Sequence, residues 1–294
     1  MLDSFIPYVL SAAMLATPQT VQADHLQQQA QQYLHMTVEQ KQLPSLVYDP
    51  VQTPAQPQQN AAGVGEWDAK SWWFMRNKQH LPPSAQQEIA ISNYDAWYLG
   101  DTQHKVIYLT FDEGYENGYT PVILDVLKEN DVHAAFFVTE SYIWNQPDLV
   151  RRMEAEGHIV GNHSSTHPNM SKLSDTYIRQ ELQNCASAYE QVVGKPMPKY
   201  FRPPEGAYSI HSLQQTQANG YKTIFWSFAY GDWDPNNQPG RDAAYQMVMD
   251  NYHNGCIMLL HAVSQSNTEA LDDMIKSLKA EGYVFLSLDD LGKT

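Results

Sequence analysis

Short apolar runs and longer amphipathic stretches alternate from about residue 97 to the end of this 294-residue chain. The apolar runs, rich in β-branched and aromatic residues, predict strands at 106–110, 134–138, 159–162, 200–202, 223–226, 257–261 and 284–286. The stretches between them predict helices at 120–129, 147–156, 174–193, 209–219, 241–253 and 268–280. Strand–helix alternation of this kind predicts a parallel sheet covered by helices.

Start and stop signals support the predicted helices. Ser174 and Asp175 mark the beginning of the longest one, and glycine stands just behind four of them, as in Gly157 and Gly194. Seven predicted strands without a glycine-rich dinucleotide motif favour a closed or nearly closed β/α barrel over an open dinucleotide-binding sheet. We therefore expect one α/β domain, a β/α barrel of about seven parallel strands, over residues 97–294.

The first 23 residues have some features of a targeting segment. Phe5 to Leu15 is mostly apolar, and Val21-Gln22-Ala23 is typical of a small-residue cleavage site. Asp3 and the lack of Lys and Arg in this stretch favour an ordinary N-terminal helix instead, so both interpretations stay open. The apolar run is too short for a standard transmembrane helix, and no stable membrane span is expected.

Two further segments precede the barrel. Residues 24–65 are rich in Gln, Pro and Ala, which predicts a polar, flexible linker. Residues 66–96 contain Trp67, Trp72 and Trp73, which are too apolar for a linker. We expect this tryptophan-rich segment to pack on the outside or one end of the barrel, with sugar stacking as the alternative role.

Composition excludes some classes of partner. The chain has 33 acidic and 18 basic residues, a formal net charge of −15, whereas nucleic acids and anionic membranes attract basic surfaces. Cys185 and Cys256 fall in a predicted helix and a predicted strand, so two buried thiols are expected rather than a disulfide. Eighteen tyrosines and seven tryptophans suit carbohydrate stacking as well as core packing.

Polar residues that could take part in catalysis or metal binding follow five of the predicted strands. They stand at the carboxyl ends of the strands, where barrel enzymes have their active sites. In chain order they are Asp112-Glu113, His163-Ser-Ser-Thr-His167, Arg202-Pro-Pro-Glu-Gly206, Asp232-Trp233 and Leu259-Leu-His261. Each set alone is typical of an ordinary loop. Five sets that converge on one face of a barrel indicate an active site.

Asp112 and Glu113 are adjacent acidic residues, and the repulsion between their two carboxylates must be offset by another group. Like charges a few ångström apart raise each other's pKa, and a bound cation or a shared proton would relieve that cost. His163 and His167 have the spacing of a metal-binding pair, and two imidazoles with one carboxylate form a common catalytic zinc shell. We therefore expect a divalent metal ion, most often zinc, at this end of the barrel.

The remaining polar residues complete a general acid–base arrangement. Asp112 would act as general base on a metal-bound water, and His261, expected on the opposite side, as general acid. Arg202 and Asp232 would fix the charge and the orientation of these two groups.

Together these motifs resemble those of the polysaccharide deacetylases, the NodB-homology carbohydrate esterases. The matching segments, in the family's order, are Thr110-Phe-Asp-Glu-Gly114, HSSTH, RPPEG, Asp232-Trp233 and LLH, over about residues 100–290. The extended forms Tyr115-Glu-Asn-Gly-Tyr119, Gly161-Asn-His-Ser-Ser-Thr-His-Pro168 and Leu260-His-Ala-Val-Ser264 look most similar to one branch. That branch comprises the peptidoglycan N-acetylmuramic acid deacetylases, which take part in forming the muramic δ-lactam of spore cortex.

The resemblance implies a distorted barrel with fewer than eight strands, a divalent metal ion that is commonly zinc, and a role for each matching residue. By position, Asp112 matches the catalytic base and Arg202 the arginine that orients it. His261 matches the general acid, and Asp232 the residue that tunes its charge.

The ligand set departs from the family at one position. His163 and His167 match metal ligands, but Glu113 stands where the broad family has a second Asp. A Glu reaches one methylene further, so we expect it to ligate from a shifted backbone. The alternative is that Glu113 turns away, which would leave two histidines and water to hold the metal loosely.

Other matching positions concern the substrate. The backbone N–H of Glu205 matches the oxyanion donor, and Trp233 and Leu259 match the walls of the pocket for the acetyl methyl group. Tyr115 lies in the loop that follows the acid pair, and we include it among the substrate-binding residues.

The sequence thus predicts an exported or cell-wall-associated hydrolase that removes the N-acetyl group from muramic acid in the glycan strands of peptidoglycan. Two alternatives stay open. A deacetylase of N-acetylglucosamine polymers would use the same strands and metal site. A non-catalytic glycan-binding barrel would account for Glu113 and for the tryptophan-rich segment, although not for the complete set of base, acid and histidines. The oligomeric state is not predicted.

Overall fold

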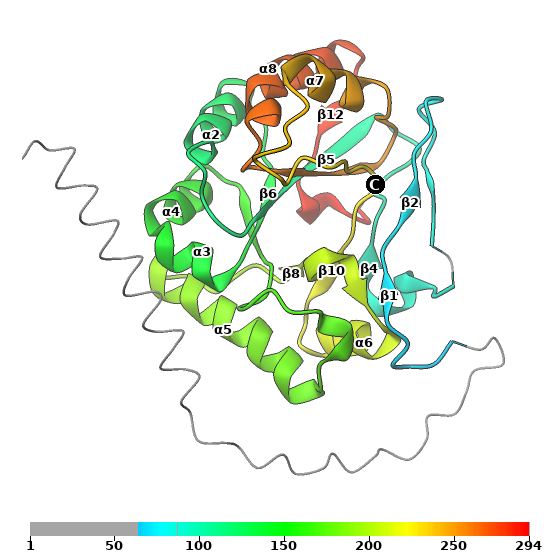
Figure 1. Ribbon diagram of the computed structural model, residues 1–294, viewed down its shortest axis with the longest axis vertical. Coiled ribbons are helices and arrows are strands. Elements are labelled where there is room, and N and C mark those ends of the chain that lie inside the picture. Colours follow the sequence, from blue (N-terminus) through cyan, green and yellow to red (C-terminus); the bar gives the residue numbers. More distant parts are fainter. Residues whose placement is uncertain (1–63, 87, 294) are drawn as a thin grey trace, which may run out of the picture. The chain divides into compact units, whose positions relative to one another are not determined.

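A curled parallel sheet with helices on its outside forms the framework of the protein (Figure 1). The structure, a computed structural model, describes residues 64–86 and 88–293. The possible targeting segment at 1–23 and nearly all of the predicted linker at 24–65 lie outside these residues. Within them, no helix is long and apolar enough to cross a membrane.

The main sheet has the strand order β11-β5-β6-β7-β8-β10-β4, with β12 paired to β5, and every pairing is parallel. Its strands are β4 (Ala96–Trp97), β5 (Val106–Glu113), β6 (Ala135–Val138), β7 (Ile159–Asn162), β8 (Tyr200–Phe201), β10 (Lys222–Ile224), β11 (Cys256–His261) and β12 (Val284–Phe285). The expectation of a distorted β/α barrel with about seven parallel strands is confirmed. The short strand β4 was not predicted, because two residues carry no readable period.

The sheet closes only through isolated contacts. Phe228, in the segment after β10, makes a single parallel bridge to Met258 of β11, and the Leu259 N–H donates to the Phe228 carbonyl at 2.9 Å. On the far side of β4, Leu99 makes a single antiparallel bridge to Cys256. The barrel is therefore nearly closed, and one of these closing contacts lies just before the loop that leads to Asp232.

Seven α-helices of the described residues surround the sheet (Figure 1). They are α2 (Thr120–Glu129), α3 (Glu140–Asn145), α4 (Pro147–Ala155), α5 (Asp175–Val193), α6 (Ile210–Ala218), α7 (Arg241–Met249) and α8 (Gln265–Ala280). Six match predicted helices, and α3 was missed because six residues are too few to show a helical period. Helix α8 begins three residues earlier than predicted, where the Ser264 hydroxyl accepts from the Asn267 N–H.

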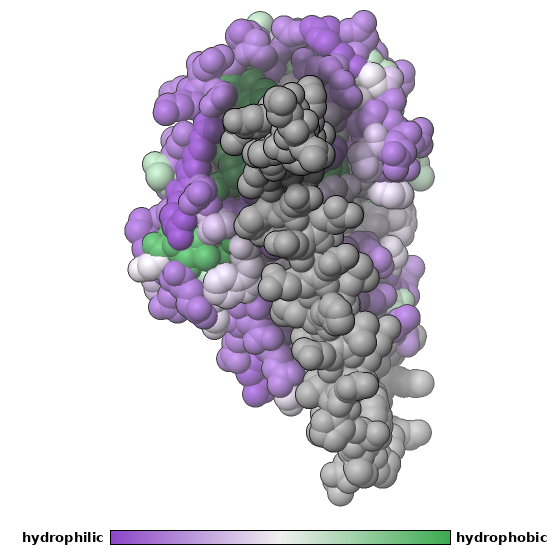
Figure 2. Space-filling model, turned by 60° about the vertical axis from the view of Figure 1, so that its left-hand side comes forward, coloured by the Kyte–Doolittle hydropathy of each residue, from purple (hydrophilic) through white to green (hydrophobic). Residues whose placement is uncertain are grey.

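Side chains of β5 alternate between two apolar clusters. Ile107, Leu109 and Phe111 pack with the helices in the larger cluster, whereas Val106 and Tyr108 pack with other strand residues inside the barrel. This alternation is the normal two-residue period of a strand. On the face drawn in Figure 2 most visible side chains are hydrophilic, as expected if the apolar faces of the helices turn inward.

The segment before the barrel adds two small antiparallel pairs of strands. Strand β1 (Lys70–Ser71) pairs with β9 (Ala207–Tyr208), and β2 (Phe74–Met75) pairs with β3 (Ser84–Ala85). Trp72 is buried, while Trp67 and Trp73 are about half-exposed. Cys185 and Cys256 are buried free thiols, as predicted.

Close packing inside the barrel makes Gly161 of β7 sensitive to substitution. A Cβ atom at this position would lie 2.7 Å from two ring carbons of Phe137. We expect Gly161→Ala to lower the free energy of unfolding by about 1–3 kcal/mol, as for other overpacked cores, measured by urea denaturation. Gly231→Ala is the matched control, since nothing lies within 4 Å of its added Cβ. Equal stability of the two variants would contradict the packing described here.

Candidate active site

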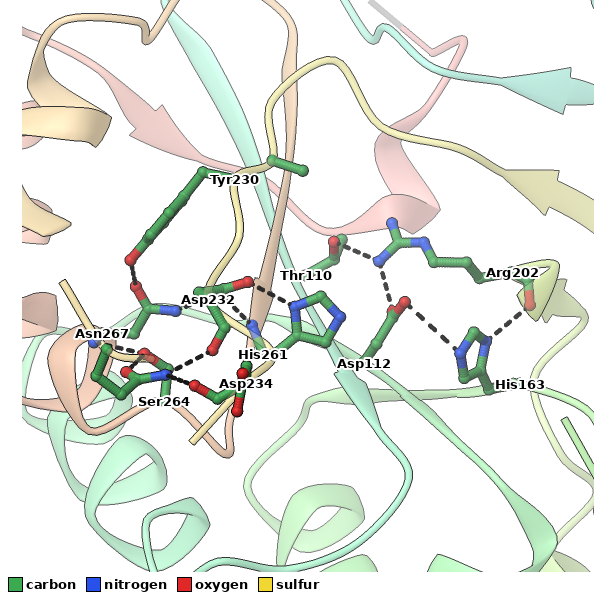
Figure 3. A network of polar contacts seen from close by, with 12 residues as sticks. Thr110, Asp112, His163, Arg202, Tyr230, Asp232, Asp234, His261, Ser264 and Asn267 are labelled. Atoms are coloured by element: carbon green, nitrogen blue, oxygen red, sulfur yellow. Dashed lines mark hydrogen bonds and ion pairs between the residues drawn. The ribbon is translucent and has the colours of Figure 1, made fainter. Parts of the chain in front are cut away.

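A buried ion pair between Arg202 and Asp112 lies at the centre of the polar network (Figure 3). Arg202 follows β8 and is fully buried, and its Nη1 donates to Asp112 Oδ1 at 2.8 Å and to Thr110 Oγ1 at 2.9 Å. Its Nε donates to the carbonyl of Ile224 at 3.0 Å, and its guanidinium lies over the Phe137 ring at 4.3 Å. The guanidinium thus joins β8, β10 and β5 inside the barrel.

The surroundings of Asp112 favour its ionised form. Burial raises the pKa of Asp112, but the charge of Arg202 and its hydrogen bond, with a smaller contribution from His261, more than offset burial and leave the pKa below its ordinary value. One oxygen, Oδ1, is occupied by Arg202, and the other, Oδ2, lies 3.7 Å from His163 Nε2. Asp112 therefore presents one free carboxylate oxygen, which can accept a proton.

His261 is the direct neighbour of Asp112, not a group across the barrel as expected from the sequence. The two residues are register partners on the adjacent strands β11 and β5, and adjacent strands lie about 4.8 Å apart. His261 Nδ1 lies 2.7 Å from Asp232 Oδ1, and the His261 N–H donates to Asp232 Oδ2 at 2.9 Å. The ring stands between Asp232 and Asp112 (Figure 3).

Asp232 favours a protonated His261. Burial lowers the pKa of His261, but the hydrogen bond and the charge of Asp232, with a smaller contribution from Asp112, bring that pKa above its ordinary value. Asp232 is itself fully buried and also accepts from the side-chain amide of Asn267. These surroundings therefore favour opposite protonation states, a protonated His261 and a deprotonated Asp112, as in enzymes that pair a general acid with a general base.

His163 and His167 lie side by side in the loop after β7. Their ring centroids are 4.9 Å apart, and the His163 Nδ1 lies 2.8 Å from the Arg202 carbonyl. A carbonyl only accepts, so Nδ1 carries the proton and Nε2 keeps its lone pair. Burial lowers the pKa of His163 to about 4, which keeps the ring neutral. A neutral imidazole oriented through its second nitrogen is the usual form of a metal ligand.

The loop that carries these histidines is held from α5. Glu181 accepts from the N–H groups of Ser165 and Thr166, at 2.9 and 2.8 Å, and from the Thr166 hydroxyl at 2.7 Å. His167 has a left-handed backbone, with φ of 58°. Its N–H donates to the Ser164 hydroxyl at 3.0 Å. These contacts fix the spacing of the two imidazoles.

Glu113 does not join the two histidines. Strand β5 continues to Glu113, so this residue falls on the same face as Phe111, toward the helices, and its register partner Val138 packs there too. Both of its carboxylate oxygens are buried without a hydrogen-bond partner. Burial, with the charges of Glu116 and Asp112, raises the pKa of Glu113 well above its ordinary value.

No set of three or more His, Cys, Asp or Glu side chains in the described part of the chain is arranged to hold a metal ion. The two neighbouring imidazoles alone have the orientation of metal ligands, and Glu113 does not supply the expected carboxylate. Asp112 Oδ2 lies 3.7 Å from His163 Nε2, close to the distance between two ligands of one tetrahedral zinc ion, about 3.4 Å for bonds of the usual length.

The residues expected to contact substrate lie around this network. Glu205 is exposed, with φ of 57° and ψ of 10° in the short 3₁₀ turn η4 (Pro204–Gly206). Trp233 and Tyr115 are more than half-exposed, and Leu259 is buried on β11. Exposed aromatic side chains at the ends of β5 and β10 suit contact with a sugar.

Several residues that the sequence did not single out support the site. Thr110 bridges Arg202 and the Met258 carbonyl, and Asn267 of α8 links Asp232 to the Tyr230 hydroxyl. Gln238 donates to the carbonyl of Asp232 at 3.0 Å. Only Thr110 gave a signal, since it belongs to the motif that ends in the acid pair. The others act through contacts between distant parts of the chain.

Known proteins that are similar to this chain include deacetylases of polysaccharides. The model of the family described as polysaccharide deacetylase matches residues 99–224. Over 223 residues the chain is 48% identical to the peptidoglycan-N-acetylmuramic acid deacetylase PdaA of Bacillus subtilis (75% of this chain, 85% of that protein). An uncharacterised 30.6 kDa protein of Geobacillus stearothermophilus is 50% identical over 222 residues (75% of this chain, 84% of that protein).

A solved structure agrees with the sequence matches. That of Bacillus subtilis PdaA, described as a family 4 carbohydrate esterase, superposes with a TM-score of 0.75 and 47% identity. The superposition covers 76% of this chain and 97% of the other.

The contact between Asp232 and His261 predicts that a substitution of Asp232 changes the pKa of His261. Asp232→Asn removes the negative charge that favours the imidazolium, so the pKa of His261 should fall by about one pH unit or more. The measurement is an NMR titration of the His261 ring. Asp234→Asn, two residues away and bonded instead to the Asn236 N–H, should leave it unchanged. An unchanged His261 pKa in Asp232→Asn would rule out the role assigned to Asp232.

Proposed function

This chain belongs to the polysaccharide deacetylase family, and from that premise we propose that it hydrolyses the N-acetyl group of N-acetylmuramic acid in peptidoglycan. Members of the family are metal-dependent hydrolases of N-acetyl amide bonds. The products are acetate and a free amine on the sugar. The similarity to the muramic acid deacetylase of Bacillus subtilis supports the choice of sugar.

One observation carries the proposal: the Asp112 carboxylate and the His261 imidazole are register partners on adjacent strands, and their surroundings favour a deprotonated carboxylate beside a protonated imidazole. The pKa of Asp112 is lowered and that of His261 is raised, and each shift favours the protonation state that the proposed role requires. Activity should therefore depend on an ionised Asp112 at low pH and on a protonated His261 at high pH, which gives a bell-shaped profile.

Each residue of the site has a separate role in the proposed hydrolysis of the amide bond. Asp112 accepts a proton from the attacking water, while Arg202 keeps the carboxylate ionised and oriented. The backbone N–H of Glu205 donates to the oxyanion that forms on the acetyl carbonyl. His261 then donates its proton to the departing nitrogen as the amide C–N bond breaks. The water supplies the new C–O bond of acetate.

His163 and His167 are the proposed metal ligands, and Zn²⁺ is the proposed ion because it favours imidazole ligands. When bound, a divalent ion supplies Lewis acidity, which polarises a carbonyl and makes a nearby water more acidic. In this arrangement Glu113 stays outside the shell.

The substrate is proposed to be the glycan strand itself. Tyr115 and Trp233 offer exposed rings for sugar contact, and Leu259 provides a buried apolar surface for the acetyl methyl group. A glycan substrate places the protein outside the cytoplasmic membrane, exported or associated with the wall.

The direct test is acetate release from peptide-free peptidoglycan, followed by digestion and mass spectrometry of the sugars. We expect loss of the acetyl group from muramic acid, and a decrease of about 10²–10⁴-fold in turnover for Asp112→Asn. Asp234→Asn, which lies outside the reacting groups, should retain turnover. Loss of acetyl from glucosamine alone would identify the other deacetylase class. Glycan binding without acetate release at any metal concentration would identify a non-catalytic barrel.

Metal binding tests the ligand set separately from activity. Zn²⁺ affinity, measured by calorimetry, should fall by about 10–100-fold or more in His163→Ala, because an imidazole ligand is lost. Glu113→Gln should leave the affinity within about twofold of the original, since its side chain faces the helices. A loss in Glu113→Gln as large as that in His163→Ala would show that Glu113 ligates after all.

A further inference from the structure

We infer that Trp72, in the segment that precedes the barrel, is a positioning residue that holds the turn carrying the Glu205 N–H. The inference rests on the function proposed above, in which that N–H binds the oxyanion. Trp72 touches no reacting group in this arrangement. It acts through the backbone of residues 205 and 206 and through the neighbouring Trp226.

Main-chain hydrogen bonds connect the segment that precedes the barrel to the turn that contains Glu205. Strand β1 pairs with β9 directly after the turn, with Lys70 opposite Tyr208 and Ser71 opposite Ala207. The Trp72 N–H then donates to the Gly206 carbonyl at 2.8 Å, which extends the pairing into the turn. The pre-barrel segment is thus hydrogen-bonded to the residue that follows the oxyanion donor.

The turn needs outside support because its backbone is unfavourable. Glu205 has φ of 57° and Gly206 has φ of 63°, so two successive residues are left-handed, and the first has a side chain. Within the turn, the Gly206 N–H donates to the Pro203 carbonyl at 3.0 Å. Residues in such conformations persist where their surroundings over-determine them.

The side chain of Trp72 supplies that support. It is 6% exposed and stacks on Phe225 at 4.5 Å between ring centroids, and its Nε1 donates to the Trp226 carbonyl at 2.9 Å. A Cβ atom on Gly206 would lie 3.0 Å from the Trp72 Cβ and 2.9 Å from the Trp226 ring. The turn is therefore pressed between the two tryptophans, with room for glycine only.

Trp226 extends the effect toward the base. Its ring also lies 5.7 Å from the Arg202 guanidinium, which packs on the Phe137 ring at 4.3 Å. A displacement of Trp72 would therefore disturb the oxyanion donor first, and the Arg202 environment only indirectly. This order predicts a loss of turnover without a change in the acid and base titrations.

The test compares Trp72→Ala and Trp72→Phe with the unmodified full chain. We expect Trp72→Ala to lower kcat by about 10-fold, a part of the roughly 10²–10³-fold that loss of an oxyanion donor costs, with KM within twofold. Trp72→Phe keeps a ring against Phe225 but lacks the indole N–H, so most of the activity should return. The limbs of the pH profile should stay in place in both variants.

Two further measurements separate positioning from stability. Ile91→Ala removes apolar surface from the same cluster as Trp72, and Ile91 takes part in none of the contacts described for Gly206. It should lower the unfolding midpoint without lowering kcat. Hydrogen exchange in peptides covering residues 203–208 should be faster in Trp72→Ala than in Ile91→Ala. If Trp72→Ala does not fold, Trp72→Phe and Gly206→Ala are measured in its place. Gly206→Ala is expected to lower kcat, because its Cβ would press against Trp72 and Trp226.

Three possible results bear on the inference that Trp72 holds the turn. Unchanged exchange at 203–208 in Trp72→Ala, or faster exchange with full kcat, would overturn the inference. Equal losses of kcat in Trp72→Ala and Ile91→Ala would overturn it as well, since they would indicate a general loss of stability. If the unmodified chain releases no acetate, the proposed function fails, while the exchange comparison still decides whether Trp72 holds the turn.

Discussion

The buried ion pair of Arg202 and Asp112 is the interaction on which the candidate site depends. A guanidinium removed from water costs several kcal/mol unless it is paired and hydrogen-bonded. Here Arg202 binds Asp112, Thr110 and the Ile224 carbonyl, and its flat face covers the Phe137 ring. Because these partners come from β5, β10 and β6, Arg202 connects three strands at this end of the sheet and also favours the ionised form of the proposed base.

His261, the proposed general acid, is held by a second network that shares no residue with the first. Asp232 comes from the loop after β10, and Asn267 from the first turn of α8. They meet at His261 of β11, whose register partner on β5 is Asp112. Register alone therefore brings the two networks to the same place, and the opposite protonation states follow from what each network supplies. A cation stabilises the carboxylate, and a carboxylate stabilises the imidazolium.

Much of this arrangement could be predicted from the sequence, because parallel strands bring their carboxyl ends together whatever their separation along the chain. Asp112, His163, Arg202, Asp232 and His261 were all found by that rule. The rule does not give strand order, so His261 was expected across the barrel from Asp112. Trp72 and Asn267 act through contacts with distant segments, for which no local pattern exists. Helix α3 and strand β4 were missed because both are too short to show a period.

Glu113 shows how three additional residues in a strand change the chemistry that the site can perform. The apolar pattern predicts a strand that ends at residue 110, which would leave both acids free to turn toward the histidines. The strand instead continues to Glu113, so its two-residue period sends Asp112 into the barrel and Glu113 toward the helices. The repulsion between the acids is then relieved without a shared cation: Arg202 pairs with Asp112, and burial raises the pKa of Glu113, which favours its neutral form. The acid pair therefore does not itself require a cation, and the proposed ligands His163 and His167 would hold a metal ion independently of Glu113.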